Sequence, residues 1–93
     1  MSSRNATLSA SERKEAPRIR RALLEARRTV RGRPKTAAAL ARKIKSRLRG
    51  FRIDYVEVID AQTLEPVRVA RRGNCAAVAA FLGRTRLIDN IIL

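Results

Sequence analysis

The first half of the chain carries apolar residues at the spacing of an amphipathic helix. From residue 16 to residue 30 an apolar side chain recurs every three or four positions, and arginines occupy most positions between them. This stripe consists of Ala16, Ile19, Ala22, Leu23, Ala26 and Val30. Ser9 and Glu12 have the spacing of a capping box, which predicts that the helix begins at Ser9. Because Pro17 lacks a backbone donor, we expect a kink there, or a helix whose regular part starts near Pro17.

A second helix is predicted after a short break. Gly32 and Pro34 end the first helix, because glycine is favoured just past a helix and proline cannot continue one. Thr36 can cap a helix that runs to about Gly50. Its buried face would hold Leu40, Ala41, Ile44 and Leu48. The two helical segments therefore form a helical hairpin.

After Gly50 the periodicity becomes that of a β-strand. Residues 51–59 alternate between apolar and polar side chains until the phase breaks after Tyr55. Such a break indicates a strand covered on both faces or one that carries a bulge. Residues 60–66 contain turn formers, and residues 68–74 are interpreted as a loop or an irregular edge.

Two further strands are predicted near the end of the sequence. Residues 75–82 are continuously apolar but too short for a typical helix, which favours a buried strand. A turn at residues 83–85 would lead into a last strand at residues 87–93. The expected fold class is α+β, with a helical hairpin packed on a small three-stranded antiparallel sheet. Residues 9–93 would form one domain.

Positive charge is concentrated in the helical half of the 93-residue chain, whose net charge is +14. Residues 1–50 carry sixteen Lys or Arg against three acids, whereas residues 51–93 carry six against five. Such a field attracts phosphates, nucleic acid or an acidic protein surface. The aromatic side chains all lie in the other half, so no platform for stacking bases is apparent. A basic module binding RNA, the ribosome or an acidic protein through Arg20, Arg21, Arg27 and Arg28 is therefore one functional hypothesis.

The remaining chemistry-bearing residues favour structural roles. Cys75 has no cysteine partner and no histidine to activate it, so a packed side chain is favoured over a disulfide or a nucleophile. Asp54, Glu57 and Asp60 occupy solvent-facing strand and turn positions rather than a carboxylate pair or metal site. No apolar segment has the length of a membrane span, and nothing indicates an oxidising compartment. We expect a cytoplasmic protein.

Three stretches carry a family resemblance. The first is Met1-Ser2-Ser3-Arg4-Asn5 with Leu8-Ser9 and Glu12-Arg13, the second lies within residues 51–66, and the third is Gly83 with Thr85-Arg86-Leu87-Ile88-Asp89-Asn90. In this order they resemble the C-terminal domain of the pantothenate synthetase (pantoate–β-alanine ligase) family. The resemblance covers essentially the whole chain. It implies a lid-like domain of an enzyme that joins pantoate to β-alanine through pantoyl adenylate.

The resemblance also implies a nucleotide site at residues 1–8. Arg4 would contact the polyphosphate of ATP, Ser2 and Ser3 would donate hydrogen bonds, and the Met1 backbone would lie near the adenosine. Mg²⁺ would accompany the nucleotide. The family's other half, which carries its His-containing phosphate motif and its pantoate site, cannot be mapped on this chain. We therefore expect a nucleotide-binding half as partner, in cis or in trans, and no activity of the chain alone.

Physical chemistry leaves two interpretations of the first loop. Two hydroxyl groups and a guanidinium ahead of a helix N-terminus could hold an anion. Alternatively, Ser2, Ser3 and Arg4 form a frayed and solvated terminus. Arg86, Asp89 and Asn90 are expected to tie the terminal hairpin together, with the alternative that Arg86 approaches the nucleotide.

Overall fold

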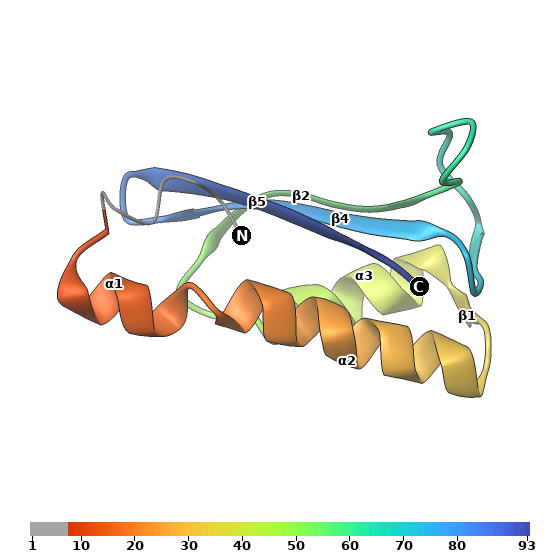
Figure 1. Ribbon diagram of the computed structural model, residues 1–93, viewed down its shortest axis with the longest axis horizontal. Coiled ribbons are helices and arrows are strands. Elements are labelled where there is room, and N and C mark those ends of the chain that lie inside the picture. The colour runs from red at the N-terminus through yellow and green to blue at the C-terminus, as the bar shows by residue number, and fades with distance from the viewer. Residues whose placement is uncertain (1–7) are drawn as a thin grey trace.

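A layer of helices covers one face of a small antiparallel sheet in the computed structural model, which describes residues 8–93 (Figure 1). The elements in chain order are α1 (Ala10–Glu15), α2 (Arg18–Gly32), β1 (Lys35–Thr36), α3 (Ala37–Ser46), β2 (Arg52–Ile59), β3 (Val69–Ala70), β4 (Cys75–Leu82) and β5 (Thr85–Ile92). The predicted α+β class, a helical hairpin on a three-stranded antiparallel sheet, is confirmed.

The start of the first helix and its interruption follow the local signals. The Glu12 backbone N–H donates to Ser9 Oγ at 3.2 Å, and the Ser9 backbone N–H donates to Glu12 Oε1 at 2.9 Å, which completes the predicted capping box. Helix α1 ends before Pro17, and α2 begins directly after it at Arg18. The expected break at Pro17 is confirmed, and the apolar stripe of the sequence is buried along its length.

Helix α3 begins where expected and ends earlier. Thr36 Oγ1 accepts from the Ala39 backbone N–H at 3.1 Å and caps the helix. The helix was expected to reach about Gly50 but ends at Ser46. Beyond it the backbone continues with three-residue hydrogen bonds, Leu48 N–H to Lys45 O and Phe51 N–H to Leu48 O. This tighter turn still buries Leu48.

The three long strands have the order β2-β4-β5 and are antiparallel throughout. The register of β2 against β4 shifts between Ile53 and Tyr55, so β2 carries a bulge at Asp54, just before the break in the sequence pattern after Tyr55. The β4–β5 turn contains only Gly83 and Arg84. Strand β5 therefore begins at Thr85, two residues earlier than predicted. Gly83 has a φ of 61°, which glycine adopts without steric cost.

A second, two-stranded sheet was not foreseen. The pairs Lys35↔Ala70 and Thr36↔Val69 join β1 to β3, and the Ala37 N–H donates to Arg68 O at 2.8 Å. The segment interpreted as a loop or an irregular edge thus contains a short strand. A strand of two residues is too short to show any periodicity, so no sequence pattern indicates it.

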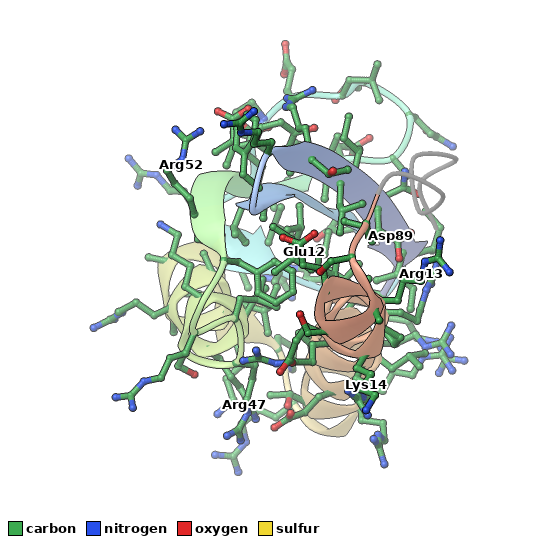
Figure 2. The ribbon with its side chains drawn as sticks, turned by 90° about the vertical axis from the view of Figure 1, so that its left-hand side faces the viewer. Glu12, Arg13, Lys14, Arg47, Arg52 and Asp89 are labelled. Atoms are coloured by element: carbon green, nitrogen blue, oxygen red, sulfur yellow. The ribbon has the colours of Figure 1, made fainter. Side chains whose placement is uncertain are left out.

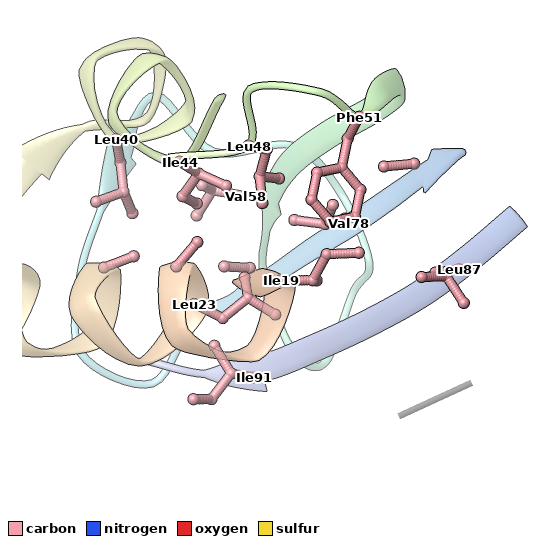
Figure 3. Close-up of a cluster of buried hydrophobic side chains, with 14 of the residues drawn as sticks. Ile19, Leu23, Leu40, Ile44, Leu48, Phe51, Val58, Val78, Leu87 and Ile91 are labelled. Atoms are coloured by element: carbon pink, nitrogen blue, oxygen red, sulfur yellow. The ribbon is translucent and has the colours of Figure 1, made fainter. Parts of the chain in front are cut away.

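The hydrophobic core lies between the helices and the sheet (Figure 3). Its largest fully buried side chains are Leu23, Leu40, Ile44, Leu48, Leu93 and Val78. Strand β4 contributes Ala76, Val78 and Ala80 at alternate positions, and the small alanines leave room for the helices to approach the sheet. On the opposite face, Ile88 and Ile92 of β5 are exposed.

Candidate functional site

The four residues to which the resemblance assigns nucleotide binding, Met1, Ser2, Ser3 and Arg4, lie outside the described residues, as does most of the expected loop at residues 1–8. Their assignment stays a prediction. The described chain starts with Leu8, whose side chain is buried in the hydrophobic core.

Glu12 connects the start of α1 to the turn between β4 and β5. Its Oε1 accepts from the Ser9 backbone N–H, and its Oε2 lies in the space that a Cβ atom at Gly83 would occupy. A side chain at Gly83 would force this carboxylate to move, and the positive φ of Gly83 also favours glycine. Two stretches of the resemblance, one at residues 8–13 and one starting at Gly83, are therefore neighbours in the fold.

Three cationic side chains surround this end of the domain. Arg13 and Lys14 of α1 and Arg84 of the β4–β5 turn are exposed, and none has an ion pair with another residue in the range 8–93. Figure 2 looks onto this end and shows Glu12 at its centre, with Arg13 and Lys14 directed outward. These three cations outnumber the one carboxylate of Glu12 at this end, and such a net positive charge favours an anionic ligand.

Asp89 ties β5 to α2. Its Oδ1 accepts from Arg20 Nη2 at 2.8 Å and from the Asn90 backbone N–H at 2.9 Å. The Asp89 side chain is only 11% exposed, and its Oδ2 is buried without a hydrogen-bond partner among residues 8–93. The expectation that Asp89 ties the terminal hairpin is wrong, because its partner lies on a helix. The bond holds α2 against the sheet and neutralises Arg20.

Arg86 also reaches beyond the hairpin. Its Nε and Nη2 donate to Asp54 Oδ2 at 3.0 Å and 2.8 Å, and its guanidinium carbon lies 6.0 Å from the centre of the Tyr55 ring. Arg86 therefore crosses β4 and joins β5 to β2 at the bulge, which corrects the expectation of a tie within the hairpin. Asp54 has the structural role that its strand position indicated.

Asp60 likewise acts in a turn. Its Oδ1 accepts from the backbone N–H groups of Gln62 at 2.8 Å and Thr63 at 2.9 Å. These hydrogen bonds stabilise the carboxylate and lower the pKa of Asp60 below its usual value, and the one from Thr63 has the larger effect.

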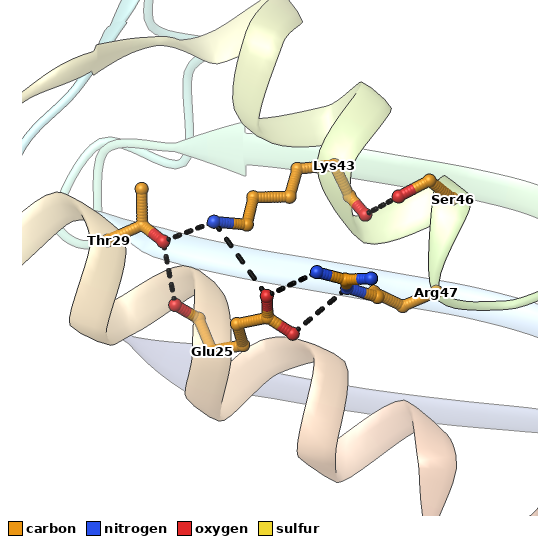
Figure 4. A network of polar contacts seen from close by, with 5 residues as sticks. All are labelled: Glu25, Thr29, Lys43, Ser46 and Arg47. Carbon is orange, nitrogen blue, oxygen red and sulfur yellow. Dashed lines mark hydrogen bonds and ion pairs between the residues drawn. The ribbon is translucent and has the colours of Figure 1, made fainter.

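A polar network between α2 and α3 was not found from the sequence (Figure 4). Glu25 accepts from Arg47 Nε at 3.1 Å and from Arg47 Nη2 at 2.8 Å, and Lys43 Nζ lies 3.8 Å from Glu25 Oε1. Lys43 Nζ also donates to Thr29 Oγ1 at 2.8 Å. The hydrogen bond from Arg47 is the main reason that the pKa of Glu25 is lowered. One signal could have found it: Glu25 is the only acid within α2, and Lys43 and Arg47 share one face of the next helical segment.

Residues 8–93 contain no cluster of His, Cys, Asp and Glu side chains that could hold a metal ion. None of the described helices combines the length and the apolar character that a membrane crossing requires.

Comparison with known proteins decides the family. The family profile described as pantoate-beta-alanine ligase matches residues 1–92. This chain belongs to the pantoate–β-alanine ligase family. It is 41% identical over 95 residues to the pantothenate synthetase of Thermosipho africanus, covering 100% of this chain and 34% of that protein. It is 43% identical over 93 residues to the pantothenate synthetase of Thiobacillus denitrificans, and this match covers 98% of this chain and 33% of that protein.

The fold agrees with a solved member of the family. The crystal structure of pantothenate synthetase from Thermus thermophilus matches 99% of this chain with a TM-score of 0.83 and 36% sequence identity. The match covers 34% of that chain. The chain thus spans about a third of the length of the curated relatives it matches, and the match falls on their C-terminal region. The resemblance stated from the sequence is confirmed.

Proposed function

We propose that this chain acts as the C-terminal domain of a pantothenate synthetase. In this role it contributes to the ATP-dependent condensation of pantoate with β-alanine via pantoyl adenylate, a step of pantothenate and coenzyme A biosynthesis in the cytoplasm. One observation carries the proposal: the chain matches pantothenate synthetases over nearly its whole length, in sequence and in fold. Two thirds of such a protein lie beyond the matched region.

The proposed contribution to catalysis is made at the Leu8 end of the domain. Arg4 would bind the polyphosphate of ATP, with Ser2 and Ser3 donating hydrogen bonds and the Met1 backbone beside the adenosine. Arg13, Lys14 and Arg84 support this proposal, because they carry charge without an ion pair at the end of the domain where α1 meets the β4–β5 turn. ATP supplies the adenylyl group that activates pantoate. The role of the chain is to position the phosphates and to stabilise negative charge in the transition state.

Mg²⁺ would accompany the nucleotide, as the family resemblance implies, because Mg²⁺ is usually bound together with substrate phosphates. The proposal therefore requires a nucleotide-binding half as partner, either in the same polypeptide or as a separate chain. Such a domain would close over the bound nucleotide and exclude water. The chain alone is expected to form no pantothenate.

The proposal is tested by mixing the chain with the nucleotide-binding portion of a pantothenate synthetase and measuring AMP release with ATP, pantoate and β-alanine. We expect AMP release to require both components and to be lost with Arg4→Ala. A matched control is Arg68→Ala, an exposed arginine without an ion pair in the described chain, which should leave the rate unchanged. Equal rates for the two variants, or no gain on mixing, would contradict the proposal.

A further inference from the structure

The solvent side of α2 carries positive charge that the fold does not fully compensate. Arg21, Arg27, Arg28 and Arg31 have no ion pair and no side-chain hydrogen bond with any residue in the range 8–93. Arg20, by contrast, is bound by Asp89.

The nearest acid along the helix, Glu25, offsets these arginines only in part: Arg28 contributes to lowering its pKa, and Arg21 lines the same surface hollow as Glu25. Glu25 is the only acid of α2, and it binds Arg47 and Lys43 on the side that faces α3. The four arginines without an ion pair, hereafter the α2 arginine face, share this single carboxylate with Lys43 and Arg47 and therefore keep a net positive charge.

The arginines are arranged along one side of the helix. Residues seven apart are nearly aligned on an α-helix and lie roughly 10 Å apart along its axis, which is the relation of Arg21 to Arg28. Arg27 and Arg31 are four apart and are neighbours on the adjoining strip. Arg21, Arg28 and Arg31 are exposed and lie away from the core side of the helix, whereas Arg27 is half-buried because it lies one turn beyond Leu23. Figure 2 shows nitrogen-tipped side chains projecting outward from the helices.

The composition of this face restricts the partner. Protein interfaces centre on apolar and aromatic anchors, and membrane-surface helices insert an apolar face. On the α2 arginine face the apolar side chain that could serve as such an anchor is Leu24, which is half-buried. Phe51, Tyr55 and Phe81 lie on or beside the strands, so the stacking that single-stranded nucleic acid requires is missing as well.

What remains is recognition of phosphate. The cations of this face are all arginines, whose planar guanidinium group binds phosphate oxygens in pairs. We propose that the α2 arginine face binds the sugar–phosphate backbone of a nucleic-acid duplex without reading its bases. Four neutralised phosphates give a slope of about −3.6 for log K against log salt concentration. Affinity then falls about 150-fold between about 50 mM and about 200 mM salt.

The test is fluorescence anisotropy of the whole chain with labelled RNA and DNA duplexes of about 20 base pairs, in two unrelated sequences, over that salt range. The variant Arg21→Gln/Arg27→Gln/Arg28→Gln should flatten the slope by about 2.7. The matched control Arg49→Gln/Arg68→Gln/Arg72→Gln removes the same charge from exposed positions on other segments that have no ion pair among the described residues, and it should leave most of the slope.

Far-UV circular dichroism checks that both triple variants fold. If the α2 variant does not, the single Arg28→Gln variant replaces it, with an expected flattening of about 0.9. The proposal is supported if both sequences bind with similar affinity and only the α2 triple variant loses affinity and salt dependence. Equal losses for the two triple variants would show that net charge alone matters, and tight binding of a poly-glutamate peptide of similar length would show an acidic protein partner. Either result, or no binding to any duplex, overturns the proposal.

Discussion

The contact between Glu12 and Gly83 makes a quantitative prediction for Gly83→Ala. A Cβ atom at this position would overlap the Glu12 carboxylate, and the residue would have to keep a φ of 61°. The left-handed backbone costs an L-residue about 1–2 kcal/mol. The overlap adds less than a core clash, because the carboxylate is the flexible end of a side chain and can move. Moving it breaks the hydrogen bond to the Ser9 backbone N–H, which is worth about 1 kcal/mol.

Gly83→Ala should therefore cost about 2–3 kcal/mol in the wild-type background but only the backbone strain of about 1–2 kcal/mol in a Glu12→Ala background. The coupling between the two positions is then about 1 kcal/mol. For a domain of this size 1 kcal/mol corresponds to roughly 4–8 °C in Tm.

The assay is urea unfolding of the two single variants, the double variant and the wild type, followed by far-UV circular dichroism. Gly73→Ala is the matched control. Gly73 also has a positive φ, but a Cβ atom there would meet nothing within 4 Å, so its cost should not depend on Glu12. A coupling below about 0.3 kcal/mol between Gly83 and Glu12 would show that the carboxylate does not lie on the turn.

Two further predictions concern the hydrophobic core and the loss of stability at acidic pH. The side chain of Leu23 is 0% exposed, and Leu23→Ala should lower the free energy of unfolding by about 2–5 kcal/mol. Leu64 is 67% exposed, and the control Leu64→Ala should change the free energy of unfolding by less than about 0.5 kcal/mol. Similar losses for the two variants in urea unfolding would contradict the assignment of Leu23 to the core. The Arg47 hydrogen bond lowers the pKa of Glu25 below its usual value of 4.5, so its stabilising effect is present above that pH and is lost as the pH falls through the folded-state pKa. The difference in urea midpoint between wild type and Glu25→Gln should therefore be full near neutral pH and shrink in acid, and a difference independent of pH would refute the assigned cause.

Features with a local signal were predicted well. The capping box at Ser9, the break at Pro17 and the cap at Thr36 each depend on a few neighbouring residues, and all three are present. The break in the alternation of β2 left open a bulge or a strand covered on both faces, and the structure has a bulge at Asp54. These features need no knowledge of the tertiary structure.

Features that depend on contacts between distant segments were missed. Arg86 pairs with Asp54 across β4, and Asp89 pairs with Arg20 of α2, because the strand register and the helix layer bring them together. Neither pairing has a sequence spacing from which it could be inferred. The candidate site has the same limit: the nucleotide role of Arg4 comes from the resemblance alone, and the description of residues 8–93 adds the charged surroundings.

The most direct measurement of the central claim replaces the matching C-terminal third of the Thermosipho africanus pantothenate synthetase with this chain and determines kcat/KM for pantothenate formation. We expect the chimera to form pantothenate and AMP at a rate well above that of the enzyme truncated before this third, and Arg4→Ala in the chimera to remove the gain. A chimera that unfolds cooperatively, and so is folded, yet turns over no faster than the truncated enzyme would contradict the account.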